Sequence, residues 1–298
     1  MKVSHYIPKI LCSLSEVTIT NLLNTFGNAK NIKATKKIHY SDDKNVFINV
    51  YEPIDRGNEK LPIFLYVHGG GWVSGGPRYR RALAKSIAAK GYIVVSVFYG
   101  LAPKYKFDSS IKNLYTALEF FLQNADKYGA DIDSIYAGGD SAGAHLACAL
   151  GVISSNDQYR SMIADLPSIA TTIKFKGLLL ICGIYNMDTA EKSGFSGISS
   201  FICFETGLSS EERKATQNAT RFSPIEYITK TFPKTFVITA QNDKLQSEGF
   251  DLAKKLHSQQ SKYRLYHGTG FSAMHAFPVA QFLQQTKRVI KYAFDWLP

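Results

Sequence analysis

The stretch Gly139-Asp140-Ser141-Ala142-Gly143 decides the fold class of this chain. It follows a short apolar segment, 134–137, and precedes a run of small and apolar residues, 142–153. A G-x-S-x-G pattern between a strand and a helix is typical of a sharp turn that holds its serine above the sheet. Glycines are needed there because larger side chains would collide with the adjacent strand and helix. The stretch therefore predicts a nucleophilic Ser141, and the alternative is a glycine-rich turn with an incidental serine.

Apolar runs of strand length alternate with helical patterns on both sides of this turn. The predicted buried strands are 61–67, 92–99, 134–137, 175–185, 234–240 and 264–267, with edge strands within 38–51. The predicted helices are 79–90, 108–128, 142–153, 247–258 and 277–296. Strands that alternate with helices predict an α/β protein with a doubly wound, mostly parallel sheet and helices on both faces. We expect one domain over residues 1–298.

Two segments fall outside this alternation. Residues 186–226 separate two strands by about forty residues, and loops of that length are usually functional. Residues 1–35 precede the regular pattern. We expect both to form a small helical cap over the carboxyl edge of the sheet, where open α/β sheets bind ligands. The roof of a small apolar pocket would come from Phe195, Ile198, Phe201, Ile202 and Phe204.

Composition excludes several classes of protein. The chain has 298 residues, 45% hydrophobic and 20% charged, which is ordinary for a folded protein and excludes disorder, collagen and coiled coil. A net charge of +11 raises the prospect of nucleic-acid binding, but the basic residues are scattered, so we expect none. Four cysteines without a C-x-x-C pair predict neither a disulfide framework nor a metal site. No apolar run reaches membrane-spanning length, and we expect a cytoplasmic protein without membrane contact.

The segment His68-Gly69-Gly70-Gly71-Trp72 directly follows the strand 61–67. A run of glycines lets backbone N–H groups turn inward and form a hole for an oxyanion. The predicted donors are Gly69, Gly70 and Gly71, together with Ala142 after the nucleophile. The alternative is a phosphate-binding loop, but the pattern is neither G-x-G-x-x-G nor a P-loop.

A serine nucleophile needs a base, and seven histidines compete for that role. The base should lie in a loop after the last strand, at the carboxyl edge of the sheet. Only His267 and His275 satisfy that position, and His275 is preferred because it lies in the loop itself. The other histidines, less suitable by position, are His5, His39, His68, His145 and His257.

The orienting acid should follow the preceding strand, and Asp243 comes directly after 234–240. Its alternative role is a helix N-cap, which aspartate also fills well. Glu248 lies farther into the following helix and is expected in solvent. The order Ser141, Asp243, His275 is the order of nucleophile, acid and base in hydrolases that carry this serine turn.

These motifs together resemble the hormone-sensitive-lipase-like branch of the α/β-hydrolase family. Tyr99-Gly100-Leu101-Ala102-Pro103 resembles the Y-R-L-A-P segment of that branch, and Asp243-Lys244-Leu245 its D-x-L segment. The similarity covers about residues 60–297. It implies a carboxylic-ester hydrolase with a Ser-Asp-His triad, no cofactor, a cap and, by analogy, a homodimer. For substrate contacts we name Trp72, Asp140 and Phe201.

Three positions depart from the pattern of the branch. Gly100 replaces the usual arginine and Lys104 the usual glutamate, so an ion pair that braces this loop is expected to be missing. Ser247 stands where a second aspartate is common. We expect these changes to affect support around the site more than the triad.

The sequence therefore predicts a serine carboxylesterase that forms an acyl-enzyme on Ser141 and hydrolyses small esters with acyl chains of roughly C2 to C6. One alternative is deacylation of amides, sugars or lactones at the same site. A second alternative is a small-molecule receptor on a hydrolase scaffold. Gibberellin receptors resemble the family but lack the catalytic histidine, so the presence of His275 disfavours that interpretation.

Overall fold

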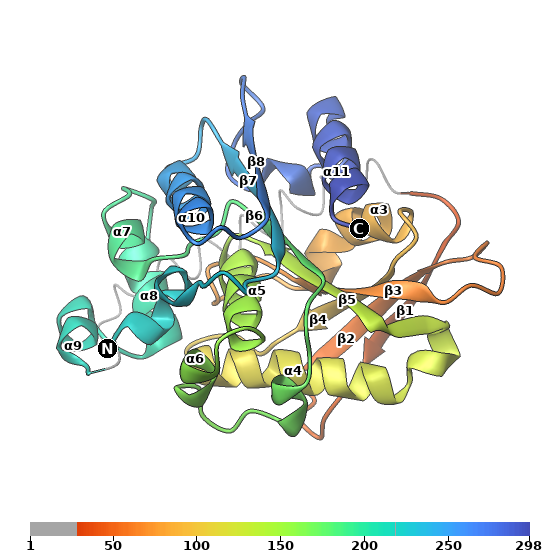
Figure 1. Ribbon diagram of the computed structural model, residues 1–298, viewed down its shortest axis with the longest axis horizontal. Helices are drawn as coiled ribbons and strands as arrows, with labels where there is room; N and C mark the ends of the chain where they lie inside the picture. The colour runs from red at the N-terminus through yellow and green to blue at the C-terminus, as the bar shows by residue number, and fades with distance from the viewer. Residues whose placement is uncertain (1–28, 218) are drawn as a thin grey trace.

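An eight-stranded sheet runs through the centre of the molecule in the order β1-β2-β4-β3-β5-β6-β7-β8 (Figure 1). The computed structural model describes residues 29–217 and 219–298. From β4 to β8 neighbouring strands are parallel, whereas β2 pairs antiparallel with both β1 and β4. The strands are β1 (Ile32–Ile38), β2 (Phe47–Pro53), β3 (Leu61–Val67), β4 (Ile93–Phe98), β5 (Ala130–Asp140), β6 (Gly177–Ile181), β7 (Lys234–Ala240) and β8 (Tyr263–Gly268).

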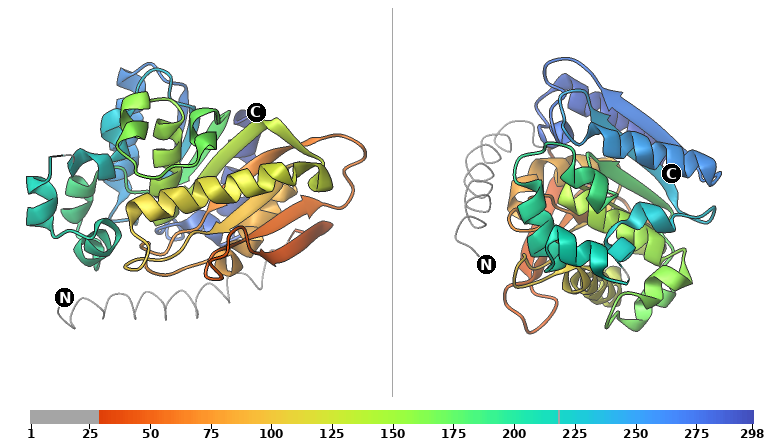
Figure 2. Two further views of the ribbon diagram at one scale, coloured as in Figure 1. Left: turned by 90° about the horizontal axis from the view of Figure 1, so that it is seen from below. Right: turned by 90° about the vertical axis from the view of Figure 1, so that its left-hand side faces the viewer.

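Helices cover both faces of this sheet (Figures 1 and 2). One apolar core lies under α4 (Phe107–Gln123), α5 (Ala142–Ile153) and α10 (Gln246–Ser258). A second core lies on the opposite face, under α3 (Arg81–Ala88) and α11 (Gln284–Trp296). This arrangement confirms the predicted doubly wound α/β architecture.

Several predicted boundaries differ from those of the structure. The expected strand 175–185 shrinks to β6, because the backbone turns out of the sheet at Cys182, which has φ +47°. The expected helix 277–296 divides into the 3-10 helix η8 (Phe277–Val279) and α11. Similarly, 79–90 begins as η3 (Pro77–Arg80), and 108–128 ends as η4 (Ala125–Tyr128).

The insertion after β6 forms a group of short helices at one end of the molecule, opposite β1 (Figures 1 and 2). They are α7 (Met187–Glu191), α8 (Ile198–Thr206) and α9 (Ser210–Ala215), followed by η6 (Ala219–Phe222) and η7 (Pro224–Tyr227). The buried Arg213 of α9 bonds to Asp188 at 2.5 Å and Glu191 at 2.8 Å, and so ties α9 to α7. Two further short elements, α6 (Asp157–Ser161) and η5 (Ser168–Thr171), lie between α5 and β6.

The other predicted cap segment, 1–35, is only partly within the described residues. Residues 1–28 lie outside them, and residues 32–35 belong to β1 rather than to a cap. They join the sheet because β1 pairs with β2 from Ile32 onward. The predicted cap boundary was therefore wrong at that end.

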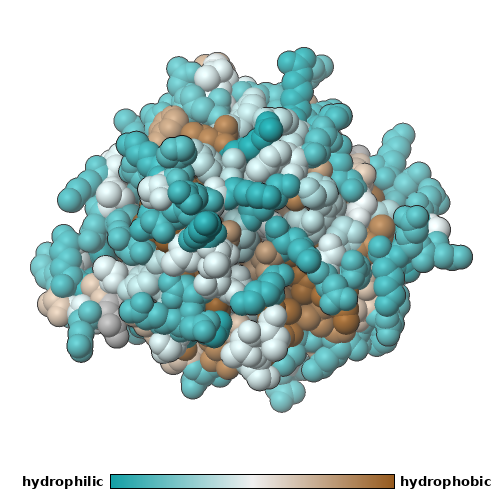
Figure 3. Space-filling view, viewed as in Figure 1, coloured by the Kyte–Doolittle hydropathy of each residue, from teal (hydrophilic) through white to brown (hydrophobic). Residues whose placement is uncertain are grey.

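The surface is mainly polar. Hydrophilic residues dominate the face shown in Figure 3, and hydrophobic residues gather there in small separate patches. Within residues 29–217 and 219–298, no helix combines the length and apolar character that a bilayer crossing requires.

Candidate active site

Ser141 occupies a strained turn between β5 and α5. Its backbone has φ +53° and ψ −121°, a region that residues with a side chain rarely adopt. The flanking glycines permit this turn, since a Cβ atom at Gly139 or Gly143 would collide with the carbonyl oxygen of Val67. The Ser141 N–H donates to the Ile181 carbonyl of β6 at 2.8 Å, and the residue is half-buried. The local structure thus presents the Ser141 hydroxyl at the carboxyl edge of the sheet.

The structure brings His275 and Asp243 into direct contact. The Nδ1–H of His275 donates to the Asp243 carboxylate at 2.8 Å. Asp243 follows β7 and has a fully buried side chain, and its other oxygen accepts the Leu245 N–H at 2.9 Å. The His275 side chain, in the loop after β8, remains 24% exposed. A backbone bridge between Asn242 and Met274 holds the two loops together.

The serine turn lies close to this pair through the end of β6. Ile181 accepts the Ser141 N–H, and the next residue is Cys182. The Cys182 Sγ, a carboxylate oxygen of Asp243 and a ring nitrogen of His275 all lie within 4.8 Å of one another. These are side chains that can also bind metal ions, and within residues 29–217 and 219–298 they form the one such cluster. Hydrogen bonds within the cluster already account for their proximity.

His267, the competing candidate for the base, lies inside β8. Its ring packs against Phe250 with the centroids 5.2 Å apart. Its Nδ1 is buried and has no hydrogen-bond partner within the described part of the chain. The position of His267 within a strand disfavours it as the base, whereas His275 lies in a loop beside Asp243.

His68 and His145 have structural partners instead. The buried His68 stacks on Tyr99 with the ring centroids 4.4 Å apart, and its Nδ1 bonds to the Gly69 carbonyl. His145 accepts the Trp72 indole N–H on Nδ1 and donates from Nε2 to the Phe222 carbonyl. Burial lowers the pKa of each imidazole to about 4. Both rings are therefore neutral near pH 7, and His145 links the glycine loop to the insertion, a role that position alone did not reveal.

Asp140 supports the glycine loop and does not face a substrate. It is fully buried and bonds to Arg80 Nε and Nη2 at 2.9 Å, and it accepts the Tyr66 hydroxyl at 2.6 Å and the Gly69 N–H at 3.1 Å. Burial opposes its ionisation, but the Arg80 charge and these donors hold the pKa of Asp140 below its ordinary value. The predicted substrate contact at Asp140 does not fit, because the carboxylate is fully buried and already bonded to Arg80, Tyr66 and Gly69.

The Gly69 N–H bond to Asp140 also changes the predicted oxyanion hole. An N–H already committed to a buried carboxylate cannot turn toward a reacting carbonyl, so Gly69 is withdrawn from the set of donors. Gly70, Gly71 and Ala142 remain candidates. Ala142 is the first residue of α5, and the first N–H groups of a helix have no acceptor within it.

The two aromatic residues predicted to contact substrate differ in position. Trp72 is fully buried, and its indole is bonded to His145, so the prediction of a substrate contact there does not fit. Phe201 of α8 lies against the glycine loop, since a Cβ atom on Gly71 would be 3.1 Å from its ring. Phe195, in the same insertion, packs on the His275 ring with the centroids 5.0 Å apart. The insertion therefore contributes one aromatic ring next to the glycine loop and another next to His275.

Glu248 is not in solvent, as the sequence suggested, but is 1% exposed. Its carboxylate accepts the N–H groups of Tyr185 and Asn186 at 2.8 and 2.9 Å, and the Thr189 hydroxyl. Burial raises the pKa of Glu248. The side chain therefore ties α10, just after Asp243, to the first residues of the insertion.

Tyr105 braces the loop that follows β4. Gly100 has φ +56°, and a Cβ atom on it would lie 2.5 Å from the Tyr105 ring. Tyr105 donates its hydroxyl to Asp43, and the Lys104 ammonium lies 4.9 Å from the Tyr105 ring centroid. Tyr105 therefore occupies the space next to Gly100. Ser247, the third departure, is exposed in the first turn of α10.

We expect Gly100→Ala to lower the free energy of unfolding by at least about 2 kcal/mol, because positive φ and the clash with Tyr105 both oppose a side chain. Gly57→Ala is the matched control. Gly57 has φ +62°, and no atom lies within 4 Å of the position that a Cβ would take, so only the backbone cost of about 1 kcal/mol applies. Urea unfolding of both variants measures the difference, and equal losses would contradict the clash.

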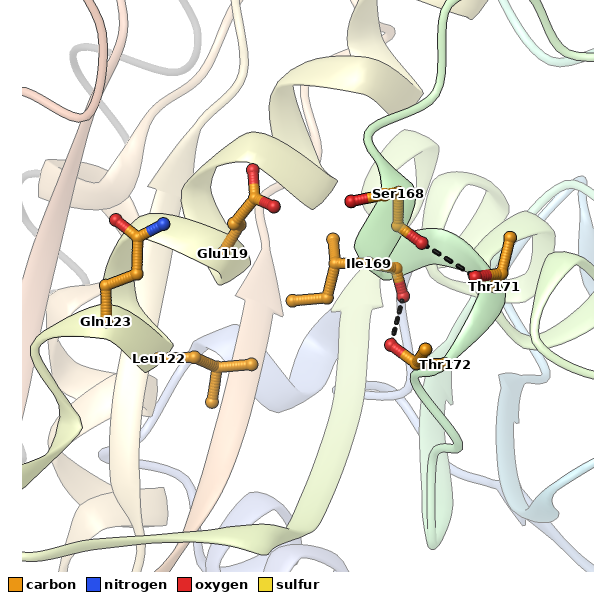
Figure 4. Close-up of a pocket in the computed structure, with 7 residues that line it drawn as sticks. All are labelled: Glu119, Leu122, Gln123, Ser168, Ile169, Thr171 and Thr172. Carbon is orange, nitrogen blue, oxygen red and sulfur yellow. Dashed lines mark hydrogen bonds between the residues drawn. The ribbon is translucent and has the colours of Figure 1, made fainter.

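A separate hollow of about 500 Å³ lies between α4 and η5 (Figure 4). Its lining residues are Glu119, Leu122, Gln123, Ser168, Ile169, Thr171 and Thr172. The end of α4 and the segment that enters β6 lie at the amino edge of the parallel strands. The hollow is therefore at the opposite edge from Ser141 and takes no part in the candidate site.

Comparisons with known proteins identify the fold family of the chain. Residues 64–278 match a family model described as alpha/beta hydrolase fold. A putative alpha/beta hydrolase of Acanthamoeba polyphaga mimivirus is 28% identical over 78% of this chain and 67% of its own length. An arylesterase of Saccharolobus solfataricus is 27% identical over 72% of this chain and 68% of its own length. The chain spans about half, 51%, of a Mycobacterium tuberculosis esterase that is 27% identical over 70% of this chain.

Solved structures share the fold at lower identity. Esterase B of Lactobacillus rhamnosis superimposes with a TM-score of 0.84 at 19% identity, over 99% of this chain and 96% of that protein. An esterase of Pyrobaculum calidifontis gives a TM-score of 0.75 at 22% identity, over 100% of this chain and 93% of that protein. At these identities the likeness establishes the fold.

Proposed function

The chain belongs to the alpha/beta hydrolase fold family, in its hormone-sensitive-lipase-like and carboxylesterase-like branch, and from that premise we propose that it hydrolyses short-chain carboxylic esters through Ser141, Asp243 and His275. The observation that carries the proposal is the 2.8 Å bond between His275 and Asp243 on loops beside a strained serine turn. If the His275–Asp243 pair had only a structural role, it would not need the strained serine turn as a neighbour.

In the proposed reaction the Ser141 hydroxyl attacks the ester carbonyl while His275 Nε2 takes its proton. Asp243 accepts Nδ1–H, which fixes the tautomer that leaves Nε2 free to act as base. The N–H groups of Gly70, Gly71 and Ala142 stabilise the negative charge that develops on the carbonyl oxygen by donating hydrogen bonds to it. His275 then returns the proton to the leaving alkoxide, and the acyl group remains on Ser141.

Deacylation uses the same groups. Water loses a proton to His275 Nε2 and attacks the acyl carbonyl, the acyl–Ser141 bond breaks, and His275 returns the proton to the serine oxygen. Atoms balance as ester plus water giving acid plus alcohol. Because only His275 carries the proton, the imidazole must be neutral at the start of each half-reaction.

The substrate would lie beneath the insertion. Phe195 packs on His275 and Phe201 on Gly71, so the two rings border the proposed reacting centre. Aromatic rings beside His275 and Gly71 favour a small apolar acyl group over a long chain, and this supports the short-chain preference.

A panel of p-nitrophenyl esters from acetate to palmitate tests the proposal. We expect kcat/KM to rise over the first few carbons, because each buried methylene contributes about 0.8 kcal/mol, and then to fall beyond roughly C6 where the pocket ends. Ser141→Ala is the control for background hydrolysis. A maximum at C10 or beyond, or activation at an oil–water interface, would overturn the short-chain assignment.

The same assay addresses the alternatives. Faster turnover of p-nitroacetanilide, acetylated sugars or lactones than of acetate esters would assign a different leaving group to the same site. Tight ligand binding without turnover would favour a receptor. Two further expectations from the sequence, a cytoplasmic location and a homodimer, are tested by cell fractionation and by light scattering.

A further inference from the structure

Cys182 occupies the point at which β6 ends and the insertion begins. Its N–H donates to the Ile238 carbonyl of β7 at 2.8 Å, and the residue before it, Ile181, accepts the Ser141 N–H. Its φ of +47° is unusual for a residue with a side chain. The backbone of Cys182 is thus fixed between the strand that carries the serine turn and the strand that leads to Asp243.

The Cys182 side chain points into the same place. It is 2% exposed, and its sulfur lies within 4.8 Å of both the Asp243 carboxylate and the His275 ring. The Asp243 carboxylate and the Ala276 N–H are among the polar groups that act on the thiol. Burial and the neighbouring carboxylates of Asp243 and Asp140 raise the pKa of Cys182 well above its ordinary value. The group is therefore a neutral thiol, with one proton to donate.

We propose that Cys182 is a positioning residue for the catalytic pair, which it holds by donating S–H to the Asp243 carboxylate and accepting the N–H of Ala276, next to His275. The proposal rests on the proposed function of that pair. One side chain thereby restrains both the acid and the loop that carries the base.

Two consequences follow from the chemistry of a buried carboxylate. Such a group needs several donors, and Asp243 has the Leu245 N–H and the His275 Nδ1–H, to which the proposal adds the Cys182 thiol within 4.8 Å. If the thiol is removed, more of the negative charge is directed at His275, which favours the protonated imidazole. The loss of the Ala276 contact also loosens the His275 loop.

Other charged groups near Cys182 and His275 are paired or directed elsewhere, so they should not mask the change in His275 protonation. Asp140, which also acts on the Cys182 thiol, is paired with Arg80. From the insertion the group that faces the His275 ring is Phe195, which carries no charge. Glu248 on α10 is directed at the backbone of Tyr185.

The experiment compares wild type with Cys182→Ala, Cys182→Gly and Cys182→Ser. Alanine and glycine both delete the thiol, and glycine also tolerates the positive φ if alanine does not fold. Serine keeps a donor and an acceptor. Cys148→Ala is the matched control, because Cys148 is a fully buried thiol in α5 whose pKa is raised by burial alone. The readouts are kcat and KM across pH for p-nitrophenyl acetate, and NMR titration of ¹⁵N-histidine-labelled protein, with His275 assigned from the signal absent in His275→Gln.

We expect Cys182→Ala and Cys182→Gly to lower kcat about tenfold with KM within twofold, and to move the acid limb of the profile and the His275 titration upward by half a pH unit or more. Cys182→Ser should restore kcat to within threefold of wild type, and Cys148→Ala should leave the profile unchanged. An unmoved His275 titration in the two deletion variants, or an equal effect of Cys148→Ala, overturns the proposal. The NMR titration does not depend on turnover. Absence of esterase activity would therefore refute the proposed function, while the titration would still test whether Cys182 positions the Asp243–His275 pair.

Discussion

Ser141→Ala is expected to lower kcat for p-nitrophenyl acetate by about 10⁴-fold or more, because the variant has no oxygen with which to form the acyl-enzyme. The fold should survive. Alanine keeps the same Cβ atom at φ +53°, so the substitution adds no strain to the turn, and the Ser141 N–H bond to Ile181 uses the backbone only. A thermal midpoint within about 3 °C of wild type is therefore expected.

Ser247→Ala is the matched control, since Ser247 is exposed on α10 and its substitution is expected to leave kcat unchanged. Mass spectrometry after a brief reaction with a phosphonate ester gives a second readout, because wild type should gain one adduct and Ser141→Ala none. If Ser141→Ala retains more than about a hundredth of wild-type kcat, Ser141 is not the nucleophile.

The succession of strands and helices along the chain and the position of the serine turn could be predicted from local sequence. Both depend on short-range patterns: apolar runs of strand length, the helical spacing between them and the glycines around Ser141. The adjacency of Asp243 and His275 follows from the same patterns, since loops after neighbouring parallel strands meet at one edge of the sheet. These parts needed no knowledge of long-range side-chain contacts.

The side chains that support the glycine loop could not be predicted from local sequence patterns. Asp140 was expected to contact substrate, yet its partner Arg80 lies sixty residues away in sequence. The pairing depends on how η3 packs beside the glycine loop, and periodicity carries no information about that. Because Asp140 takes the Gly69 N–H, the same long-range contact also changed the predicted oxyanion donors.

The burial of Glu248 also depends on a long-range contact that local sequence patterns do not reveal. A glutamate in the first turn of a helix usually lies in solvent. Here the insertion folds back so that the N–H groups of Tyr185 and Asn186 need an acceptor, and Glu248 supplies it. The sequence signal that could have indicated this is the position of Glu248 five residues after Asp243, on the helix face turned toward the end of β6.

The choice of base is tested by comparing His275→Ala with His267→Ala in stopped-flow acylation. We expect His275→Ala to slow acylation by about 10⁴-fold, because Ser141 would lose its proton acceptor. His267→Ala should stay within about threefold, since that ring packs against Phe250 inside β8. Asp243→Asn should also be severely slowed, because an amide cannot hold the Nδ1–H tautomer in the way a carboxylate does.

The pH dependence of these variants identifies the group that carries the proton. Burial lowers the pKa of His68 and of His145 to about 4, so both rings stay neutral above about pH 5 and cannot produce an activity loss there. Wild-type acylation is expected to rise with pH because the proposed base must be neutral, and His267→Ala should keep the same rise. The residual activity of His275→Ala should lack it. If His267→Ala is the more damaging change, or removes the pH-dependent rise while His275→Ala keeps it, then His267 is the base, and the Asp243–His275 bond only supports the loop.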